Sequence, residues 1–283
     1  MDGDMFEKTR YRWMIVLSAL SSVLLASWAG LGSMAVAPLT LRLPIAPGEK
    51  GAGAFLVRNT GTDPIVVHIS LHDWWRTPEG KFQILPAGSL ERSCAPWIVY
   101  SATTLELVPG EEVQVSVQVS VPEDVEGDHW ALLLVSEEPQ PVEERQAEEG
   151  LTSTTRVVVT YAVKILQQDP VNAAPAAEIR GVELVSQDPL TLQIRYANTG
   201  NCHITGQGVV ELRDIFGETV RSYMVGPFPL LPGEERVVTI EDTKGEPLPE
   251  GLYYAIALFD FGGEYLVQGG APIRITSAAS TTQ

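Results

Sequence analysis

The sequence predicts an all-β chain of two tandem β-sandwiches that follow an N-terminal apolar segment. Short stretches in which apolar and polar residues alternate recur between turn-forming residues over most of the chain after residue 38. None of these stretches has the three- and four-residue apolar spacing of an amphipathic helix. A set of motifs also occurs twice in the same order, which indicates that one structural unit is used twice.

The repeat consists of three motifs: an Asn-Thr-Gly turn, a Pro-Gly-Glu-Glu turn, and a Gly that precedes an aromatic and apolar strand. The spacing is 18 residues from Pro109 to Gly127 and 19 residues from Pro232 to Gly251. We therefore expect Pro109 and Pro232, and likewise Gly127 and Gly251, to occupy equivalent positions. The motifs are Asn59-Thr60-Gly61, Pro109 to Glu112 and Gly127 to Leu132 in the first copy, and Asn198-Thr199-Gly200, Pro232 to Glu235 and Gly251 to Ile256 in the second.

The N-terminal segment has the features of an export signal. Three basic residues among the first 12 precede an uncharged apolar run from Trp13 to Ala37. Ser27-Trp28-Ala29 and Ser33-Met34-Ala35 both end in a small residue that suits signal peptidase. The run is also long enough to span a bilayer if it is not cleaved. Residues 1–37 are thus predicted to be a signal peptide or a signal anchor, and the protein is expected in the periplasm or at the cell surface, tethered by residues 13–37 if cleavage does not occur.

The first predicted sandwich covers residues 38–166. Its clearest strand begins at Val113, because Val at every second position places Val113, Val115, Val117 and Val119 on one face, toward a core. Gly and Pro in the intervening turns supply the positive and the fixed φ angles that turns require. Strands are expected at Ala54–Asn59, Ile65–Asp73, Lys81–Leu85, Leu105–Val108, Val113–Val121, Trp130–Ser136 and Arg156–Leu166.

The second predicted sandwich covers residues 178–276 and follows a semi-stiff linker at 167–177, with a polar tail at 277–283. Val237 is expected in the strand equivalent to that of Val113. Seven or so short strands bounded by turns are typical of a β-sandwich. They are expected at Ile179–Ser186, Thr191–Asn198, Gly208–Arg213, Val220–Val225, Glu235–Ile240, Tyr253–Asp260, Tyr265–Gln268 and Ile273–Thr276.

The net charge limits the kinds of partner that are expected, and the cysteine content limits the possible disulfide bonds. The net charge is −17, and the sequence has no basic stripe that would follow nucleic-acid phosphates, so nucleic acid is not an expected partner. Cys94 and Cys202 fall one in each predicted sandwich. A single bridge between them is chemically allowed outside the cytosol, and two buried free thiols are the alternative.

The sequence contains no recognisable catalytic or metal-binding motif. It has no Gly-x-Ser-x-Gly, no phosphate-binding Gly loop, no Cys-x-x-Cys and no His-Glu-x-x-His. His68 and His72 share one face of a predicted strand about 13 Å apart. That separation is too large for one metal ion, whose bonds to His nitrogen are about 2 Å long. We expect a non-enzymatic protein without a metal ion or another cofactor.

Aromatic residues offer a second kind of candidate site. Trp74 and Trp75 are neighbours, so on a strand one faces the core and the other faces the opposite side. An outward Trp is suited to binding a ligand, and it is equally suited to being covered by a loop. Trp97, Trp130 and the Tyr253-Tyr254 pair are expected in the cores.

Several motifs of the first half resemble those of a known family. They are the stretch from Gly53 to Thr60, the segment from Trp97 to Val99, and the Leu-x-Pro-Gly turn that ends at Gly110 before an alternating strand. Over residues 38–166 the chain resembles the N-terminal immunoglobulin-like domain of periplasmic pilus-assembly chaperones. The resemblance, together with the repeat, implies two tandem immunoglobulin-like β-sandwiches.

The resemblance also implies a partner-binding site. In this family an Arg on the first strand and a Lys on the last strand of the domain anchor the client's C-terminal carboxylate, and apolar residues before that Lys donate a strand to the client. The corresponding residues here are Arg42 for the first position and Arg156 or Lys164 for the second. The residues from Glu148 to Thr155, which precede Arg156, depart from the alternating apolar pattern that strand donation uses.

The predicted function is therefore that of an exported, non-enzymatic protein that binds another extracytoplasmic protein, with fibre or pilus subunits as the implied clients. The alternative is a structural or adhesive module of the cell envelope, similar to the WxL-interacting surface proteins. Those proteins bind wall polymers or partner proteins and typically finish in a C-terminal membrane anchor, and the sequence shows no second apolar run of that kind.

Overall fold

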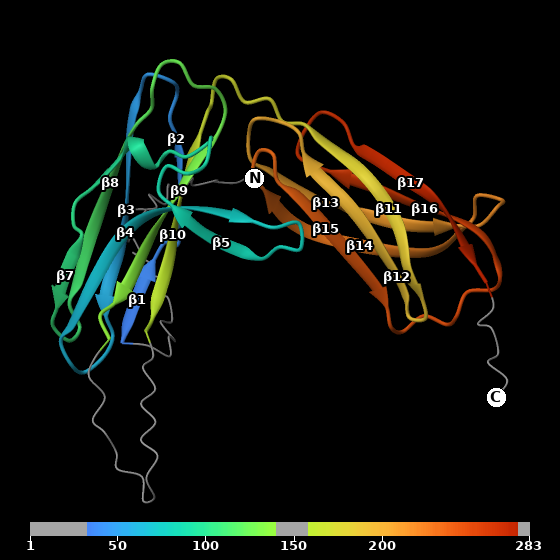
Figure 1. Ribbon diagram of the computed structural model, residues 1–283, viewed down its shortest axis with the longest axis horizontal. Helices are drawn as coiled ribbons and strands as arrows, with labels where there is room; N and C mark the ends of the chain where they lie inside the picture. Colours follow the sequence, from blue (N-terminus) through green and yellow to red (C-terminus); the bar gives the residue numbers. More distant parts are fainter. Residues whose placement is uncertain (1–32, 140–157, 277–283) are drawn as a thin grey trace, which may run out of the picture. The chain divides into compact units, whose positions relative to one another are not determined.

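The computed structural model describes residues 33–139 and 158–276, which form two β-sandwiches in tandem (Figure 1). Seventeen strands and one short 3-10 turn at Ala95–Trp97 make up the regular structure of this part of the chain. The predicted all-β class and the arrangement as two sandwiches are confirmed. Most of the predicted export segment, Arg156 and the predicted tail lie outside the described residues. In the described ranges no helix has the length and apolar character needed to span a membrane.

The first sandwich packs two sheets face to face. One sheet has the strand order β1-β3-β8-β6, and the other has the order β2-β10-β9-β4-β5 with β7 paired to β4. The predicted inward face of β8 is confirmed, since Val115, Val117 and Val119 are fully buried and Val113 packs at the margin of the same core. The strands are β1 Met34–Ala37, β2 Thr40–Pro44, β3 Lys50–Asn59, β4 Ile65–Arg76, β5 Phe82–Pro86, β6 Ile98–Tyr100, β7 Thr104–Leu107, β8 Glu112–Ser120, β9 His129–Glu137 and β10 Thr160–Gln168.

The second sandwich repeats this arrangement with fewer strands. Its sheets have the orders β11-β12-β15 and β14-β13-β16-β17. In each sandwich the strand that ends at the Asn-Thr-Gly turn, β3 or β12, pairs with the first strand and with the strand after the Pro-Gly turn, which is the pairing of an immunoglobulin-like sandwich. The strands are β11 Ala177–Gln187, β12 Leu190–Asn198, β13 Ile204–Arg213, β14 Thr219–Leu230, β15 Glu235–Asp242, β16 Gly251–Asp260 and β17 Val267–Ile275.

Equivalent hydrogen bonds at the repeated turns show that the two copies are alike in detail. Asn59 ends β3 and Asn198 ends β12, and both side chains are buried. Gly110 N–H donates to the carbonyl of Asn59, and Gly233 N–H donates to that of Asn198. The predicted equivalence of the two Pro-Gly turns is confirmed. The side-chain partners are the carbonyls of Asp63 and Leu107 and the N–H of Gly61 for Asn59, and the carbonyls of Cys202 and Leu230 and the N–H of Gly200 for Asn198.

The third repeated motif is equivalent in strand but not in backbone conformation. Gly127 precedes β9 with a φ of 76°, whereas Gly251 is the first residue of β16. Strands β9 and β16 nevertheless take the same place, each between the strand after the Asn-Thr-Gly turn and the last strand of its sandwich. Gly127 lies against Asn201 of the second sandwich, which has no counterpart at Gly251.

Several expectations need correction. Strand β1 precedes the predicted boundary at residue 38, and its Met34 is fully buried in the first core. The two short strands expected after Tyr265 are one continuous strand, β17. Val237 and its neighbours do lie on the expected strand, β15, whose Val238 and Ile240 pack against the core.

Of the two alternatives for the cysteines, the structure has the free thiols, and one aromatic expectation changes. Cys94 and Cys202 are both buried and both free, so the bridge between the sandwiches is not formed. Tyr253 is buried as expected, whereas Tyr254 is exposed on the opposite face of β16.

Candidate functional site

The sheet of the first sandwich that contains β10 carries functional candidates on its outer face, away from the core. Arg42 on β2 lies opposite Leu166 on β10, and Lys164 on β10 lies opposite Leu132 on β9. Because paired residues and residues two apart on a strand share a face, these side chains lie on one surface. We call this surface the outer face. A small apolar cluster covers it, formed by Trp74, Trp130, Leu132, Leu166 and, from the second sandwich, Leu231.

Lys164 is held against aromatic rings. Its Nζ lies 4.9 Å from the centroid of the Trp74 ring and 5.6 Å from that of Phe82, and these two rings stack on each other with centroids 5.2 Å apart. Burial lowers the pKa of Lys164; the nearby cations Arg76 and Arg42 act in the same direction, and the carboxylate of Glu234 acts in the opposite direction. No carboxylate forms an ion pair with Lys164 in residues 33–139 and 158–276. Its charge is therefore partly removed from water without a directly paired anion.

Arg76, in contrast, is neutralised by a buried carboxylate. Its Nε lies 2.9 Å from Oε1 of Glu234, and its Nη2 donates to Oε2 at 2.9 Å and to the carbonyl of Pro229 at 2.8 Å. Arg236 also reaches Oε1 of Glu234 at 2.9 Å. Burial lowers the pKa of Arg76, while Glu234 acts in the opposite direction. This cluster ties β4 of the first sandwich to the β14–β15 turn of the second.

Further bonds hold the same two regions together. The β4–β5 hairpin reaches toward the second sandwich in Figure 1, and the carbonyl of Pro78 in its turn accepts the N–H of Val237 at 2.8 Å. Nearby, the buried carboxylate of Asp128 accepts both the N–H and Nδ1 of His203 at 2.7 Å. These hydrogen bonds join the two sandwiches next to the outer face.

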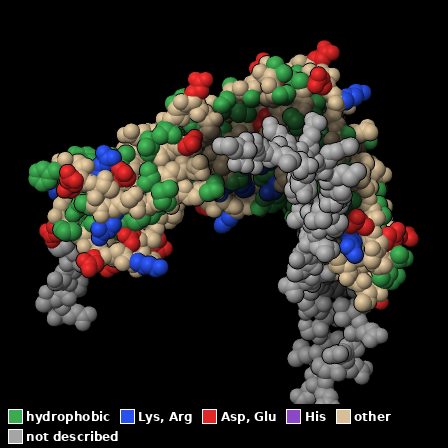
Figure 2. Space-filling view, turned by 180° about the vertical axis from the view of Figure 1, so that it is seen from behind, with side chains coloured by type: hydrophobic (Ala, Val, Ile, Leu, Met, Phe, Trp, Pro, Cys, Tyr) green, Lys and Arg blue, Asp and Glu red, His purple; other side chains and the backbone are tan. Residues whose placement is uncertain are grey.

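The structure brings two of the predicted site residues together. Arg42 and Lys164 lie on adjacent parallel strands, two positions apart in the pairing register, on the same face. Arg156, the other candidate for the second position, lies outside the described residues. Figure 2 shows several Lys and Arg side chains in the hollow at the middle of the face that it displays.

The sequence analysis did not predict that Lys164 lies against aromatic rings. It also did not predict the ion pair that neutralises Arg76. Arg76 and Glu234 are 158 residues apart, and no local pattern marks such a pair. A signal for Glu234 did exist in the repeated Pro-Gly-Glu-Glu turn, where Glu111 is its counterpart. Each of these Glu side chains accepts the backbone N–H three residues earlier, at 2.9 Å.

Among the described residues, one edge of β10 has no partner strand near Lys164. Strand β2 pairs with β10 from Lys164 to Gln168, and β9 pairs with its other side from Thr160 onward. Within the described part of the chain, no strand pairs with the β2 side of β10 between Thr160 and Val163. An exposed strand edge of this kind offers backbone groups for the addition of another strand.

The histidines are placed apart from one another. His68 lies 3.5 Å from Glu138 on the surface, and His72 is hydrogen bonded to Ser70. In the described ranges, no three metal-ligating side chains are grouped closely enough to hold a metal ion. The outer face thus carries cations, aromatic rings and an open strand edge as its chemical features.

Comparison with known proteins returns similar structures only. A scan of family models finds no match for the sequence, and a search of curated proteins finds none. A chaperone–tip adhesin complex of CFA/I fimbriae has a TM-score of 0.48 at 8% sequence identity, over 84% of this chain and 98% of that chain. The CsuC–CsuE chaperone–tip adhesion subunit complex of Acinetobacter baumannii has a TM-score of 0.46 at 12% identity, over 85% of this chain and 98% of that chain.

The E. coli chaperone DraB has a TM-score of 0.40 at 13% identity, over 84% of this chain and 95% of that chain. Each of these three structures contains a chaperone, and each shares at most 13% sequence identity with this chain.

Proposed function

We propose that the protein is an exported, non-enzymatic binding protein that holds another extracytoplasmic protein on the outer face of its first sandwich. The observation that carries the proposal is the environment of Lys164, a half-buried cation on aromatic rings with Arg42 nearby. A cation that has lost water is best stabilised by a hydrogen-bonded anion. The C-terminal carboxylate of a client protein supplies such an anion.

The open edge of β10 supports a second contact with the same client. An extended client segment that ends at Lys164 would run along Thr160 to Val163 and take up the free backbone groups there. The sequence from Val157 to Val163 is apolar except for Thr160. The run before Lys164 is thus mainly apolar, whereas the run before Arg156 is polar or acidic, which favours Lys164 as the second basic residue.

Export and the class of client rest on the sequence. The charged and apolar regions before residue 38 are typical of a secretory segment. The motif resemblance favours fibre or pilus subunits as clients. Both features agree with a binding surface that has cations and a strand edge.

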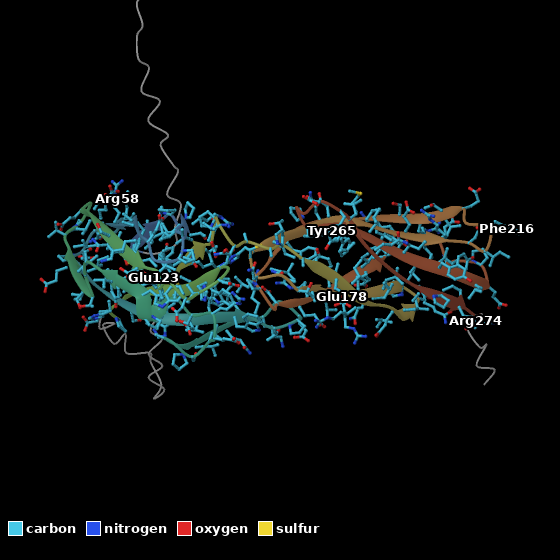
Figure 3. All side chains as sticks on the ribbon, turned by 90° about the horizontal axis from the view of Figure 1, so that it is seen from above. Arg58, Glu123, Glu178, Phe216, Tyr265 and Arg274 are labelled. Atoms are coloured by element: carbon cyan, nitrogen blue, oxygen red, sulfur yellow. The ribbon has the colours of Figure 1, made fainter. Side chains whose placement is uncertain are left out.

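Substitution of the two cations tests the proposal. Lys164→Met and Arg42→Ala should each weaken capture of the partner that co-purifies from the cell envelope by more than about tenfold, because an unpaired interfacial charge typically costs about 2 to 5 kcal/mol. Arg58→Ala is the matched control: Arg58, labelled in Figure 3, is exposed on β3 of the opposite sheet. Unchanged capture by both variants would overturn the carboxylate site. Capture of a wall polymer in place of a protein would favour the adhesive module.

A further inference from the structure

A cavity of about 610 Å³ lies beside Trp75, separate from Lys164 and Arg42. The first sandwich lines it with Trp75, Leu90, Glu91, Arg92 and Trp130. The second sandwich lines it with its copies of the two repeated turns, at 198–200 and 232–233. The equivalent turns of the first sandwich do not line this cavity.

The cavity has an aromatic wall. Trp74 is buried with 2% of its surface exposed, whereas its neighbour Trp75 is half-buried and lines the cavity. Trp75 stacks on the buried Trp130 with ring centroids 5.9 Å apart. Trp75 is therefore held by its stacking partner while part of its surface remains open for contact with an apolar ligand group.

One cation of the cavity is held in place but not neutralised. Nη1 of Arg92 donates to the carbonyls of Glu126 at 3.0 Å and Asp128 at 3.3 Å. No carboxylate in residues 33–139 or 158–276 is ion-paired with Arg92, whereas Arg180, also at the cavity, lies 2.8 Å from a carboxylate oxygen of Glu235. The bonds of Nη1 orient the guanidinium, and its other donors are suited to a carboxylate.

Most polar groups of the turn at 198–200 are already bonded within the protein. The side chain of Asn198 uses its amide on the carbonyls of Cys202 and Leu230 and its oxygen on Gly200. The N–H groups of Thr199 and Gly200 donate to the carbonyl of Ala176. Few groups of this turn remain to bind the many hydroxyls of a sugar, which makes a peptide the better match for the cavity.

We propose that this cavity binds an acidic peptide segment in which a large apolar side chain adjoins a carboxylate. The apolar side chain packs on Trp75, and the carboxylate pairs with Arg92. The proposal rests on the proposed protein-binding function in one respect: the peptide segment is part of the partner protein. The cavity then gives that partner a second point of attachment, which Lys164 and Arg42 do not line.

Short blocked peptides added to the full purified protein test the site. Acetyl-Phe-Glu-amide should shift the indole N–H signal of Trp75 in NMR spectra and bind at least about tenfold more tightly than acetyl-Phe-Gln-amide or acetyl-Ala-Glu-amide, since a hydrogen bond to a charged group contributes about 1.5 to 3 kcal/mol. Trp75→Ala and Arg92→Met should each remove this preference. Lys164→Met and Arg58→Met should retain it, which separates failure of the cavity from failure of the outer face.

Three outcomes would overturn the proposal. The first is equal binding of the three peptides. The second is no shift of the Trp75 signal by any of them. The third is tight binding of cellohexaose that Trp75→Ala abolishes, which would identify a carbohydrate site. If Arg92→Met does not fold, as judged by circular dichroism, the comparison of the three peptides on the unaltered protein still decides.

Discussion

The carboxylate of Glu234 is fully buried, and it pairs with Nη2 of Arg76 at 2.9 Å across the two sandwiches. A buried ion pair is not by itself strong support for stability, because desolvation offsets the attraction. Removing one partner is different, since it leaves a buried charge without compensation. Glu234 also faces Arg236, so its loss leaves two cations unpaired.

Glu234→Gln should therefore lower the free energy of unfolding by about 3 to 5 kcal/mol. The amide retains an oxygen that accepts the N–H of Leu231 but no longer neutralises the arginines. Glu111→Gln is the matched control, because Glu111 has the same turn bond and no arginine partner among the described residues. Its expected loss is at most about 1 kcal/mol. Urea unfolding measures both, and equal losses would show that the ion pairs contribute nothing.

The buried Asn residues of the two repeated turns should be equivalent in energy as well as in structure. Asn59→Ala and Asn198→Ala each leave two carbonyls and one N–H without their partner, at buried or partly buried positions, so each should cost at least about 2 kcal/mol. Asn201→Ala should cost less, because the bonds of its side chain are exposed. Thermal and urea unfolding of the three variants check this. A large loss at one buried Asn only would mean that the copies differ in their dependence on the turn.

Local patterns were sufficient to predict most strands and the duplication. Alternating Val residues specify β8 because one side of a sandwich sheet faces the core and the other faces water. The same logic shows why Tyr253 and Tyr254 are not both core residues: neighbours on a strand point to opposite faces. The Pro-Gly and Asn-Thr-Gly turns were visible because their backbone geometry demands particular residues.

Features that depend on distant segments were not visible in the sequence. Strand β1 continues the apolar N-terminal run without any change of composition, so its start at Met34 had no local signal. The expected strands Tyr265–Gln268 and Ile273–Thr276 are joined through Gly269 and Gly270, and Gly269 packs closely against Ile179. Of the candidate site, the pairing of Arg42 with Lys164 came from the family resemblance, while the aromatic support by Trp74 required the fold.

Lys164 should make the stability of the folded protein change with pH in the alkaline range. Burial lowers the pKa of Lys164 in the folded protein, so folding disfavours its charged form. The free-energy cost of folding with a charged Lys164 is present in full below the pKa of Lys164 in the folded protein. It vanishes above the ordinary pKa of 10.5. The stability of the unaltered protein relative to Lys164→Met should therefore rise with pH through that window. Melting temperatures between pH 7 and pH 11 test it, with Lys50→Met on β3 as the exposed control. A difference that stays constant with pH would contradict the assignment.

Export should depend on the apolar run before the first sandwich. Replacing Leu24 and Leu25 by Asp should abolish it, because a charge in the centre of such a segment costs about 2.5 to 3.5 kcal/mol per residue on insertion. Fractionation of cells that express the tagged protein gives the answer. The matched variant, Leu24→Val with Leu25→Val, keeps the run apolar and should be exported normally. Recovery of the unaltered protein from the cytosol would show that the predicted export is wrong.

If the segment is cleaved, the fold decides between the two predicted cleavage sites. Cutting after Ala35 would remove Met34, which is fully buried and whose carbonyl accepts the hydroxyl of Tyr161 at 2.9 Å. It would also remove Ser33, whose carbonyl accepts the N–H groups of the Asn-Thr-Gly turn.

Cutting after Ala29 preserves all of β1. The mature N-terminus should therefore be Gly30, as read by N-terminal sequencing of the exported protein. Ala29→Leu should block processing at this site, since signal peptidase requires a small residue there. Ala35→Leu should leave it unaffected. An N-terminus at residue 36 would mean that the first sandwich folds without half of its first strand.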